Sequence, residues 1–307
     1  MANLFIKGAV SSYIGVSRKN NEDNYFLNGK YAQYDDDNQN SSAFQPLVQS
    51  GIFGIFDGMG GQSKGEFASF CAAKTLQKYQ EDMLNDPHHT IDRYVNDVNR
   101  QICHEMNRIQ KQIGSTMAIL RIQNGTADAY NLGDSCIYHL SGNTLTKLSY
   151  DHTVAEQLYR NGLLTRTEAR KDIRRHQLTK HLGILSGEEH LKVHRNTAIR
   201  ITNGDMFLLC TDGISDTLSE NDIKIIMQQS DGKCRKAVEM MIQKAVEKGS
   251  SDNITAIVLK AVKRMNKNYF FSTLNIDKHP HTYSFILGTI VTAIFFIIVI
   301  IIILTLF

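Results

Sequence analysis

The sequence predicts an α+β fold followed by a membrane-spanning helix at the carboxyl end. Strand-like and helical stretches succeed one another as strands, a pair of helices, strands, more helices and a last strand. Because the helices come in groups and not singly between strands, this order favours layers of antiparallel sheet and helix over a doubly wound parallel sheet. The membrane helix is predicted from residues 284–307, which are apolar and carry no charged side chain.

Strands and turn-rich segments alternate in the first sixty residues. The amino terminus, MANLFIKGAV, has the apolar pattern of a first strand. A second strand begins at Tyr25, and the polar tract Tyr34–Pro46 is interpreted as an exposed loop between two strands. The bulky apolar run GIFGIF, residues 51–56, predicts a buried strand that ends on Asp57.

Two helices and a group of strands are predicted next. Apolar residues recur at helical spacing over Glu66–Met83 and Ile91–Ile113. Four short apolar runs then predict strands, the last two joined by a Gly-Asn turn: Ser115–Ile122, Thr126–Leu132, Ser135–Leu140 and Leu145–Leu148. The strongly charged stretch Asp151–Gly183 is predicted to be helical.

The remaining stretch before the membrane segment predicts a strand, two helices and a last strand. These elements are, in order, Asp205–Cys210, Glu220–Gln229, Lys233–Lys248 and Asn253–Val262. Residues 263–283 are basic and polar, which is typical of a linker next to a membrane.

The composition favours a reduced compartment and no nucleic-acid partner. The formal net charge is +3 over 307 residues, so no strong excess of one sign calls for a nucleic acid. Five cysteines are widely spaced and contain no C-x-x-C pair. We therefore expect buried thiols of a cytosolic protein, not a disulfide frame or a zinc site.

The predicted membrane helix also orients the rest of the chain. A helix of about 22 residues is about 33 Å long, which matches the apolar thickness of a bilayer. A buried core helix is the alternative, but such a helix seldom lacks every polar face. The basic residues before the segment are Lys263, Arg264, Lys267 and Lys278. The positive-inside rule therefore predicts a single-pass, tail-anchored protein of the cell membrane whose amino-terminal part is cytoplasmic.

Four aspartates lie at the ends of predicted strands, next to glycine, asparagine or serine. They are Asp57 in FDGMGG, Asp134 in NLGDS, Asp212 in CTDGISD and Asp252 in SSDNITAIV. A single aspartate in such a place is usually a turn former or a helix cap. Four of them at one end of a core would repel one another unless a cation lay among them. Oxygen ligands favour Mg²⁺ or Mn²⁺ over zinc, and a glycine lets a backbone carbonyl approach the same ion.

The glycines near Asp57 do not fit two other phosphate-binding motifs. A Walker A loop that starts at Gly60 fails because Glu66 stands where a lysine is required. A dinucleotide-binding fingerprint that starts at Gly58 fails because residue 63 is serine and not glycine. A metal site therefore remains the better interpretation.

A separate cluster, GVSRKNNEDNYF at residues 15–26, places Arg18 shortly before Glu22 and Asp23. One interpretation is a hairpin closed by salt bridges. The other is that the Arg18 guanidinium forms a fork for two phosphate oxygens, beside carboxylates that assist a metal site.

Six motifs, taken together, resemble the type 2C metal-dependent protein serine/threonine phosphatases, the PPM family. They are RKNNEDNY, FGIFDGMGG, GSTM, NLGDS, LLCTDGISD and SSDNITAIV, in this order, and the match runs from about Ile6 to Val262. Met59, where many eukaryotic members have histidine, resembles the bacterial members. The resemblance implies a four-layer αββα sandwich of two antiparallel sheets flanked by helices. We accordingly expect a catalytic domain at residues 1–262 with a flap at about 151–190, a linker at 263–283 and the membrane helix at 284–307.

The resemblance also implies roles for the residues of two metal sites. Asp57 would bridge two ions, Mn²⁺ or Mg²⁺, with the carbonyl of Gly58 on the second ion and with Asp212 and Asp252 completing the first. A bridging water of lowered pKa would attack phosphorus. The Arg18 side chain would neutralise charge on the phosphoryl oxygens.

Further residues would support these ions. By the same resemblance, Glu22 and Asp23 would hold metal-bound waters, and Asn253 would orient Asp252 or a water. Asp134 and Asp216, together with Asp212, would bind a third and weaker ion.

Some residues depart from the family pattern or stay ambiguous. Met59 cannot donate a proton, so the leaving group would be protonated by water or by another residue. Cys136 stands where relatives often have arginine. The histidines lack ligand spacing and are interpreted as surface residues: His88, His89, His176 and His181. Four basic flap residues could meet an acidic phosphopeptide, although a solvated helical face is the preferred interpretation: Arg170, Lys171, Arg174 and Arg175.

These observations together predict a membrane-anchored, Mn²⁺- or Mg²⁺-dependent phosphatase. Its substrates would be phosphoserine and phosphothreonine in cytoplasmic proteins, where it would oppose serine/threonine kinases, a membrane kinase among them. The alternative is a pseudophosphatase that binds phosphoproteins at the membrane without hydrolysing them. The presence of Asp57, Asp212 and Asp252 favours the enzyme.

Overall fold

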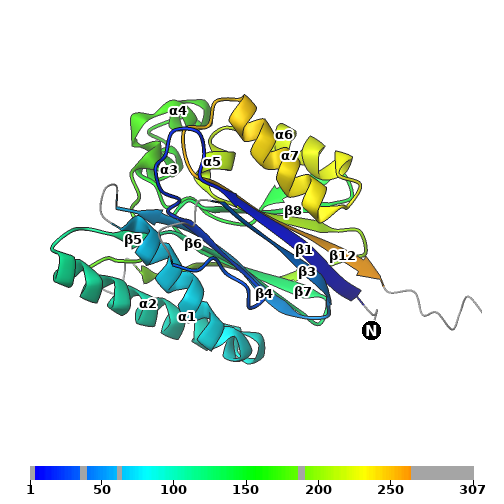
Figure 1. Cartoon of the computed structure of the whole chain (residues 1–307). Coiled ribbons are helices and arrows are strands. Elements are labelled where there is room, and N and C mark those ends of the chain that lie inside the picture. Colours follow the sequence, from blue (N-terminus) through cyan, green and yellow to red (C-terminus); the bar gives the residue numbers. More distant parts are fainter. Residues whose placement is uncertain (1–3, 35–39, 61–63, 186–190, 264–307) are drawn as a thin grey trace, which may run out of the picture. The chain divides into compact units, whose positions relative to one another are not determined.

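Figure 1 shows the computed structural model of the chain, which describes residues 4–34, 40–60, 64–185 and 191–263. The chain divides into two units, residues 1–263 and 264–307. The predicted linker and membrane helix belong to the second unit and lie outside the described residues, as does the C-terminal anchor that they would form. Within the described ranges, no helix combines the length and the apolar character that a bilayer crossing requires.

The first of two antiparallel sheets joins the two ends of the described chain. Strand β1 pairs along its whole length with β12, so that Leu4 is opposite Lys263 and Tyr13 is opposite Ile254. The strand order is β3 (Asn40–Val48), β1 (Leu4–Tyr13), β12 (Ile254–Lys263), β11 (Met206–Cys210), β8 (Cys136–Ser141) and β9 (Thr144–Lys147).

The second sheet carries the strand that ends on Asp57. All of its pairings are antiparallel, and the short strand β5 (Gly114–Ser115) pairs with the end of β4. The strand order is β10 (His194–Arg200), β7 (Thr126–Leu132), β6 (Met117–Gln123), β4 (Gly51–Met59) and β2 (Asp23–Leu27).

Helices cover the outer face of each sheet, which gives the predicted layers of helix, sheet, sheet and helix (Figure 1). The long helices α1 (Gly65–Asn85) and α2 (Pro87–Ile109) pack on the second sheet. Helices α6 (Glu220–Gln229) and α7 (Cys234–Glu247) pack on the first sheet. The α+β fold with two antiparallel sheets is thus confirmed.

The apolar run in β4 is explained by burial on both faces of its sheet. Ile52 and Phe56 contact the helices α1 and α2, whereas Phe53 and Ile55 lie in the core between the two sheets. Neighbouring residues of a strand point to opposite faces, so a strand covered on both sides has no polar alternation. The first polar residue of the run, Asp57, therefore marks the end of the layered core.

Three predictions of local structure were wrong or incomplete. Asn40–Val48, largely assigned to a loop, forms the edge strand β3, whose exposed and partly buried residues alternate. Its polar residues and Pro46 are tolerated because an edge strand needs hydrogen bonds on one side only. The mainly polar strand β10 was not predicted. The charged stretch after Asp151 forms only short helices: α3 (Val154–Arg160), α4 (Arg166–Lys171) and the 3-10 helix η1 (Ile173–His176).

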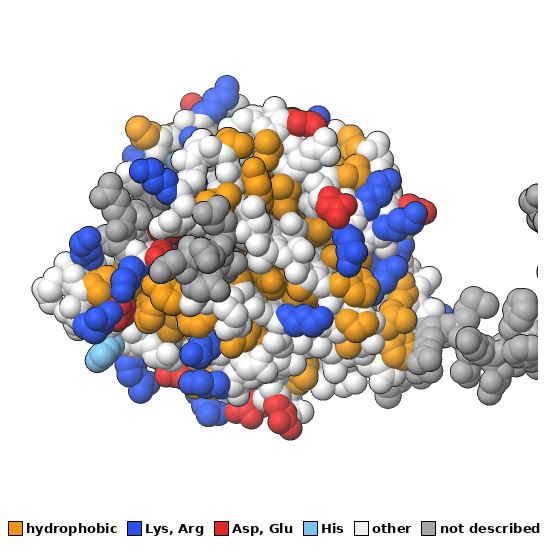
Figure 2. Space-filling view, viewed as in Figure 1, with side chains coloured by type: hydrophobic (Ala, Val, Ile, Leu, Met, Phe, Trp, Pro, Cys, Tyr) orange, Lys and Arg blue, Asp and Glu red, His pale blue; other side chains and the backbone are white. Residues whose placement is uncertain are grey.

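The face of the molecule shown in Figure 2 carries charged side chains of both signs. On the face shown in Figure 2, lysine and arginine side chains are scattered among aspartate and glutamate, and apolar side chains lie between them. This agrees with the small net charge of +3.

Candidate metal centre

The predicted acidic residues converge at one end of the two sheets. Asp23 on β2 and Asp57 on β4 are directly opposite each other in the antiparallel ladder. Asp212 follows β11 at the start of helix α5 (Asp212–Ser215), and Asp252 lies two residues before β12, the neighbour of β11. Asp134 lies in the turn between β7 and β8. Both sheets therefore contribute carboxylates to one site.

The crowding of these carboxylates raises their pKa values. Burial, followed by the charges of Asp212 and three further aspartates, raises the pKa of Asp57 well above its usual value. Burial, followed by the charge of Asp134, also raises the pKa of Asp212 well above its usual value. Each group is thus harder to ionise because its neighbours are also acidic and water is largely excluded.

The surrounding carboxyl groups follow the same rule. Burial, and then the charge of Asp151, raises the pKa of Asp134 to about 8. Burial raises the pKa of Glu22 to about 7, with a further contribution from Glu66. Burial also raises the pKa of Asp23 to about 7, although hydrogen bonds from two threonines oppose this shift.

The residues present fit a divalent cation. The Oδ1 atom of Asp212 is buried and accepts no hydrogen bond within the described part of the chain. A buried carboxylate oxygen without a partner is costly, and a bound cation would remove that cost. The donors are oxygens, which suit Mg²⁺ or Mn²⁺. Asp57, Gly58, Asp212 and Asp252 remain the predicted ligands of this position.

Close backbone packing explains the glycine after Asp57. A side chain on Gly58 would place its Cβ atom 2.3 Å from the carbonyl oxygen of Gly65 and 2.5 Å from that of Glu22. The Gly58 N–H donates a hydrogen bond to the same Glu22 carbonyl at 3.0 Å. The missing side chain therefore lets the loop that carries Glu22 and the start of α1 meet at the site.

Asn253 ties the arginine loop to the metal centre. Its Nδ2 group donates hydrogen bonds to the carbonyls of Ile14, at 2.8 Å, and Asn20, at 3.0 Å. Its Oδ1 atom accepts a hydrogen bond from the Glu22 N–H at 2.8 Å. We predicted that Asn253 orients Asp252 or a water. Its backbone N–H donates a hydrogen bond to Oδ1 of Asp252 at 2.7 Å, and its side chain in addition fixes the loop that presents Arg18.

Arg18 lies at the candidate metal centre and forms an ion pair with Asp252, one of the predicted metal ligands. Its Nη2 group donates a hydrogen bond of 2.7 Å to Oδ2 of Asp252. The other oxygen of Asp252 accepts a hydrogen bond from the Asn253 N–H. The Arg18 side chain is 45% exposed, so a phosphate group that arrives from solvent can reach it. The ion-pair partner of Arg18 comes from the far end of the chain and not from Glu22 or Asp23, and the phosphate-fork interpretation stays a prediction.

Asp23 is held below the site by hydroxyl groups. Its Oδ2 atom accepts hydrogen bonds from Thr211 at 2.9 Å and from Thr255 at 2.6 Å. Thr255 is in turn hydrogen-bonded to Ser12 at 2.8 Å. These bonds fix the Asp23 carboxylate from β11 and β12 while it faces Asp57 across the β2–β4 ladder.

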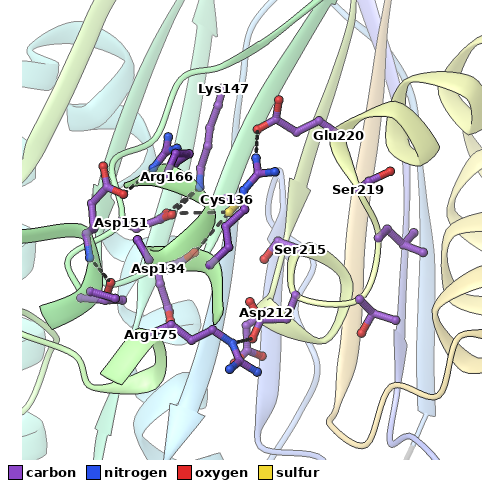
Figure 3. Close-up of a pocket in the computed structure, with 18 of the residues that line it drawn as sticks. Asp134, Cys136, Lys147, Asp151, Arg166, Arg175, Asp212, Ser215, Ser219 and Glu220 are labelled. Atoms are coloured by element: carbon purple, nitrogen blue, oxygen red, sulfur yellow. Dashed lines mark hydrogen bonds and ion pairs between the residues drawn. The ribbon is translucent and has the colours of Figure 1, made fainter. Parts of the chain in front are cut away.

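A cavity of about 440 Å³ adjoins the acidic residues. Figure 3 shows Asp134 and Asp212 on its wall, with the flap on one side and helix α5 on the other. The flap here means residues 151–185, the described part of the predicted flap. The cavity wall also carries residues that we had not singled out, notably Lys147 and Asp151, whose side chains are 2.6 Å apart.

Three of the four basic flap residues form ion pairs and are not merely solvated. Arg174 binds Asp172 at 2.8 Å within the flap, and Arg170 reaches Glu220 on α6 at 3.6 Å. Arg175 lies 3.8 Å from Asp216. The pairs of Arg170 and Arg175 connect the flap to helix α6 and to the end of helix α5.

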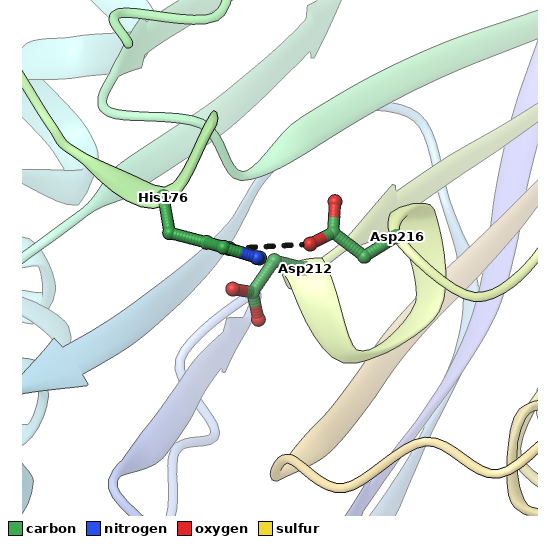
Figure 4. A group of neighbouring side chains, drawn as sticks. All are labelled: His176, Asp212 and Asp216. Carbon is green, nitrogen blue, oxygen red and sulfur yellow. Dashed lines mark ion pairs between the residues drawn. The ribbon is translucent and has the colours of Figure 1, made fainter. Parts of the chain in front are cut away.

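His176 is exposed, as predicted, but its ring also approaches one of the predicted acidic residues (Figure 4). Its Nδ1 atom lies 3.3 Å from Oδ2 of Asp216. Forty residues separate the two side chains in the sequence, so no local motif predicts this contact. By contrast, Nδ1 of His181 lies 2.9 Å from the carbonyl of the neighbouring Leu182.

Comparison with known proteins identifies the family. A family model described as protein phosphatase 2C matches residues 32–257, which is well over half of the chain. The chain belongs to the protein phosphatase 2C family.

Relatives of this phosphatase 2C chain agree in sequence and in fold. The serine/threonine phosphatase stp of Listeria welshimeri is 26% identical over 240 residues, which is 76% of this chain and 92% of the relative. The PPM Ser-Thr phosphatase MsPP from Mycobacterium smegmatis, solved in complex with cacodylate, has a TM-score of 0.63 and 27% identity. That match covers 82% of this chain and 97% of MsPP.

A further solved structure shares the fold and contains metal. It is the catalytic domain of the serine/threonine protein phosphatase PstP in complex with two manganese ions, with a TM-score of 0.66 and 24% identity. The match covers 85% of this chain and all of that chain. The fold of the phosphatase 2C family thus agrees with the layers described above.

Cys136 lies beside the cavity, close to other polar groups. The residue is buried beside the cavity, and its thiol donates a hydrogen bond to the backbone carbonyl of Asp134 at 3.2 Å. A hydrogen bond from Cys210 lowers the pKa of the Cys136 thiol to about 7, with a further contribution from Lys147 and against the effect of burial. All five cysteines are free, as predicted.

The raised pKa of Asp134 predicts how the metal-free protein responds to pH. The folded chain keeps the Asp134 proton up to about pH 8, whereas the usual value is 3.8. Ionisation of this group therefore destabilises the folded state increasingly as the pH rises through this window. In EDTA, Asp134→Asn should unfold at nearly the wild-type temperature at pH 4 and at a higher temperature than wild type at pH 8.

Thermal unfolding of both proteins across this pH range provides the measurement. The difference between variant and wild type is the relevant quantity, because other titrating groups, such as His152, change both proteins alike. A difference that does not change with pH would show that Asp134 is not an acid held in its neutral form.

Proposed function

We propose that this protein is a divalent-cation-dependent phosphatase that hydrolyses phosphoserine and phosphothreonine in proteins. The observation that carries the proposal is the cluster of Asp57, Asp212 and Asp252, with an unpartnered buried oxygen on Asp212. Membership of the phosphatase 2C family supports the reaction class. The name of the Listeria relative and the two manganese ions of the PstP structure support the substrate class and the metal.

Two cations would be held by Asp57, Gly58, Asp212 and Asp252. Bound there, divalent ions supply a water of lowered pKa as the nucleophile and neutralise charge on the phosphoryl group. The chain holds the carboxylates at fixed positions to which the ions can bind. The strand ends and the hydroxyl groups that donate hydrogen bonds to Asp23 fix these positions. A rigid arrangement lowers the cost of reorganisation during the reaction.

Arg18 would orient the phosphate group. A guanidinium group can donate two parallel hydrogen bonds to phosphate oxygens, which sets the direction of the phosphorus atom. Asn253 holds the loop that carries Arg18, because its side chain makes three hydrogen bonds to the backbone of that loop. Met59 ends β4 and cannot donate a proton, so the leaving serine or threonine oxygen takes its proton from water or from another group.

The protein would act at a membrane. The support is the uncharged apolar segment 284–307, preceded by basic residues, which favours a cytoplasmic catalytic domain on a single-pass anchor. A phosphatase in this position would meet phosphoproteins near the inner face of the membrane and would oppose serine/threonine kinases there, a membrane kinase among them. The link to a kinase is inferred from the shared position at the membrane.

The phosphatase proposal predicts a metal-dependent activity that requires Asp212. Full-length protein should hydrolyse a phosphothreonine peptide with Mn²⁺, and excess EDTA should abolish the reaction. Asp212→Asn should lower kcat/KM about 100-fold or more, because it removes a charged ligand at the reacting centre. The matched control is Asp231→Asn, at an exposed turn whose φ of 51° asparagine tolerates well.

Release of inorganic phosphate under steady-state conditions measures this activity. Hydrolysis that persists in EDTA would overturn the metal-dependent mechanism. Tight binding of the phosphopeptide by wild type with no phosphate release would instead support the pseudophosphatase.

The anchor proposal predicts that two charges in the apolar segment release the protein from membranes. Wild-type protein should stay with the membrane pellet after extraction with alkaline carbonate. The double variant Ile297→Arg, Ile298→Arg should be extracted, since each arginine near the centre of a membrane helix costs about 2.5–3.5 kcal/mol. Extraction of the wild type under the same conditions would contradict a membrane-spanning segment.

A further inference from the structure

Cys136 and Cys210 lie next to each other on two neighbouring strands of the first sheet. Cys136 is the first residue of β8, Cys210 is the last residue of β11, and the two are directly opposite in the antiparallel ladder. Opposite residues point to the same face of a sheet, and here both side chains belong to the core that α6 and α7 cover. A hydrogen bond joins the two thiols.

The spacing of opposite residues suits a disulfide bond. Their Cα atoms are about 4.5–5.5 Å apart in an antiparallel pair, which falls within the range of about 4.4–6.8 Å found across disulfides. The two thiols therefore reach each other without a rearrangement of the sheet. By contrast, each of the other three cysteines lies on a helix and donates a hydrogen bond to an oxygen atom: Cys71 to Gln101, Cys103 to the carbonyl of Ile184, and Cys234 to the carbonyl of Lys7.

The surroundings of Cys136 favour its reaction with a small oxidant. Cys136 is only 1% exposed, but it lines the cavity beside the flap, so a molecule as small as hydrogen peroxide can reach its sulfur. The ammonium group of Lys147 is hydrogen-bonded to this sulfur and is held by Asp151 at 2.6 Å (Figure 3). A neighbouring positive charge stabilises the negative charge that sulfur carries when it attacks an oxidant.

We propose that Cys136 and Cys210 form a site of reversible oxidation, at which a peroxide converts the two thiols into a disulfide bond. The Cys136 sulfur takes one oxygen atom of the peroxide, whose O–O bond breaks, and the other oxygen leaves as water. The Cys210 sulfur then attacks the sulfenic acid on Cys136, so that an S–S bond forms, the S–O bond breaks and a second water leaves. The two sulfurs lose two electrons in total, and these reduce the peroxide to water.

The site is a feature of this chain and does not follow from the family pattern. Cys136 stands where relatives often have arginine, and an arginine opposite Cys210 could not form the bond. All five cysteines are free in the structure, which is the reduced form of the proposed site. Disulfides of cytosolic proteins are mostly transient and sense the redox state, and a dithiol reductant would return this one to two thiols.

The disulfide would change the metal centre, because both cysteines adjoin its acidic residues. Asp212 follows Cys210 by two residues, and Asp134 precedes Cys136 by two. The Cβ atoms of opposite residues are about 4.5–5.5 Å apart, and a disulfide draws them to about 3.8 Å. The strand ends that carry the two aspartates therefore move closer together, which weakens Mn²⁺ binding. This effect rests on the proposed function, whereas the disulfide itself does not.

Peptide mapping of the full-length protein tests the disulfide. Metal-free protein in detergent is treated with hydrogen peroxide, which catalase then removes, and the remaining thiols are alkylated. Trypsin places Cys136 in the peptide 122–147 and Cys210 in the peptide 201–224, and neither peptide contains a second cysteine. Mass spectrometry should find these two peptides linked, with the loss of two hydrogen atoms, and dithiothreitol should separate them.

Phosphate release from a phosphothreonine peptide tests the effect on the metal centre. When Mn²⁺ is added after the same treatment, kcat/KM of wild type should be about tenfold or more below that of the reduced protein, because small displacements at a reacting centre are costly. Dithiothreitol should restore it. Cys136→Ser and Cys210→Ser should each keep their activity through the peroxide treatment, and either variant suffices if the other does not fold. The matched control is Cys103→Ser on α2, which should be inhibited like wild type.

The outcomes separate this inference from the proposed function. Peptides 122–147 and 201–224 that stay unlinked in peroxide-treated wild type would overturn the inference. Linked peptides with unchanged Mn²⁺-dependent activity would overturn the effect on the metal centre. Linked peptides in a protein that releases no phosphate even when reduced would support the oxidation site and overturn the proposed function.

Discussion

Repulsion among buried carboxylates is the constraint on which the rest of this site depends. Asp57 lies opposite Asp23 and close to Asp212, and burial together with these neighbouring charges strongly disfavours its ionised form. Without a cation, the protein must either keep protons on these groups or bear their mutual repulsion. The hydrogen bonds, glycines and ion pairs around the site hold these mutually repelling carboxylates in fixed positions.

The two-sheet architecture explains why the carboxylates meet. Strands from both sheets end at the same side of the sandwich, and the apolar core between them keeps their spacing rigid. The long pairing of β1 with β12 brings Arg18 and Asp252 together although they are 234 residues apart. The flap and helix α5 meet on the remaining side, where Arg175 and His176 approach Asp216.

The sequence was most informative where one motif controls one local structure. The apolar run before Asp57 predicted a strand and its end, and the strand-end aspartates predicted the metal site. Residues whose role depends on contacts across the fold were harder to predict. His176 has no ligand spacing in the sequence, and Asn253 holds a loop that lies about 230 residues earlier. Polar edge strands such as β3 lack the apolar alternation on which strand prediction relies.

Proton release on metal binding tests the central claim most directly. Mn²⁺ should be added to the metal-free, full-length protein at pH 7 in weak buffer, and the released protons counted by titration. If the carboxyl groups hold protons until a cation replaces them, each chain should release at least one proton, and the release should shrink in Asp212→Asn. Saturating Mn²⁺ binding without any proton release at pH 7 would contradict the account.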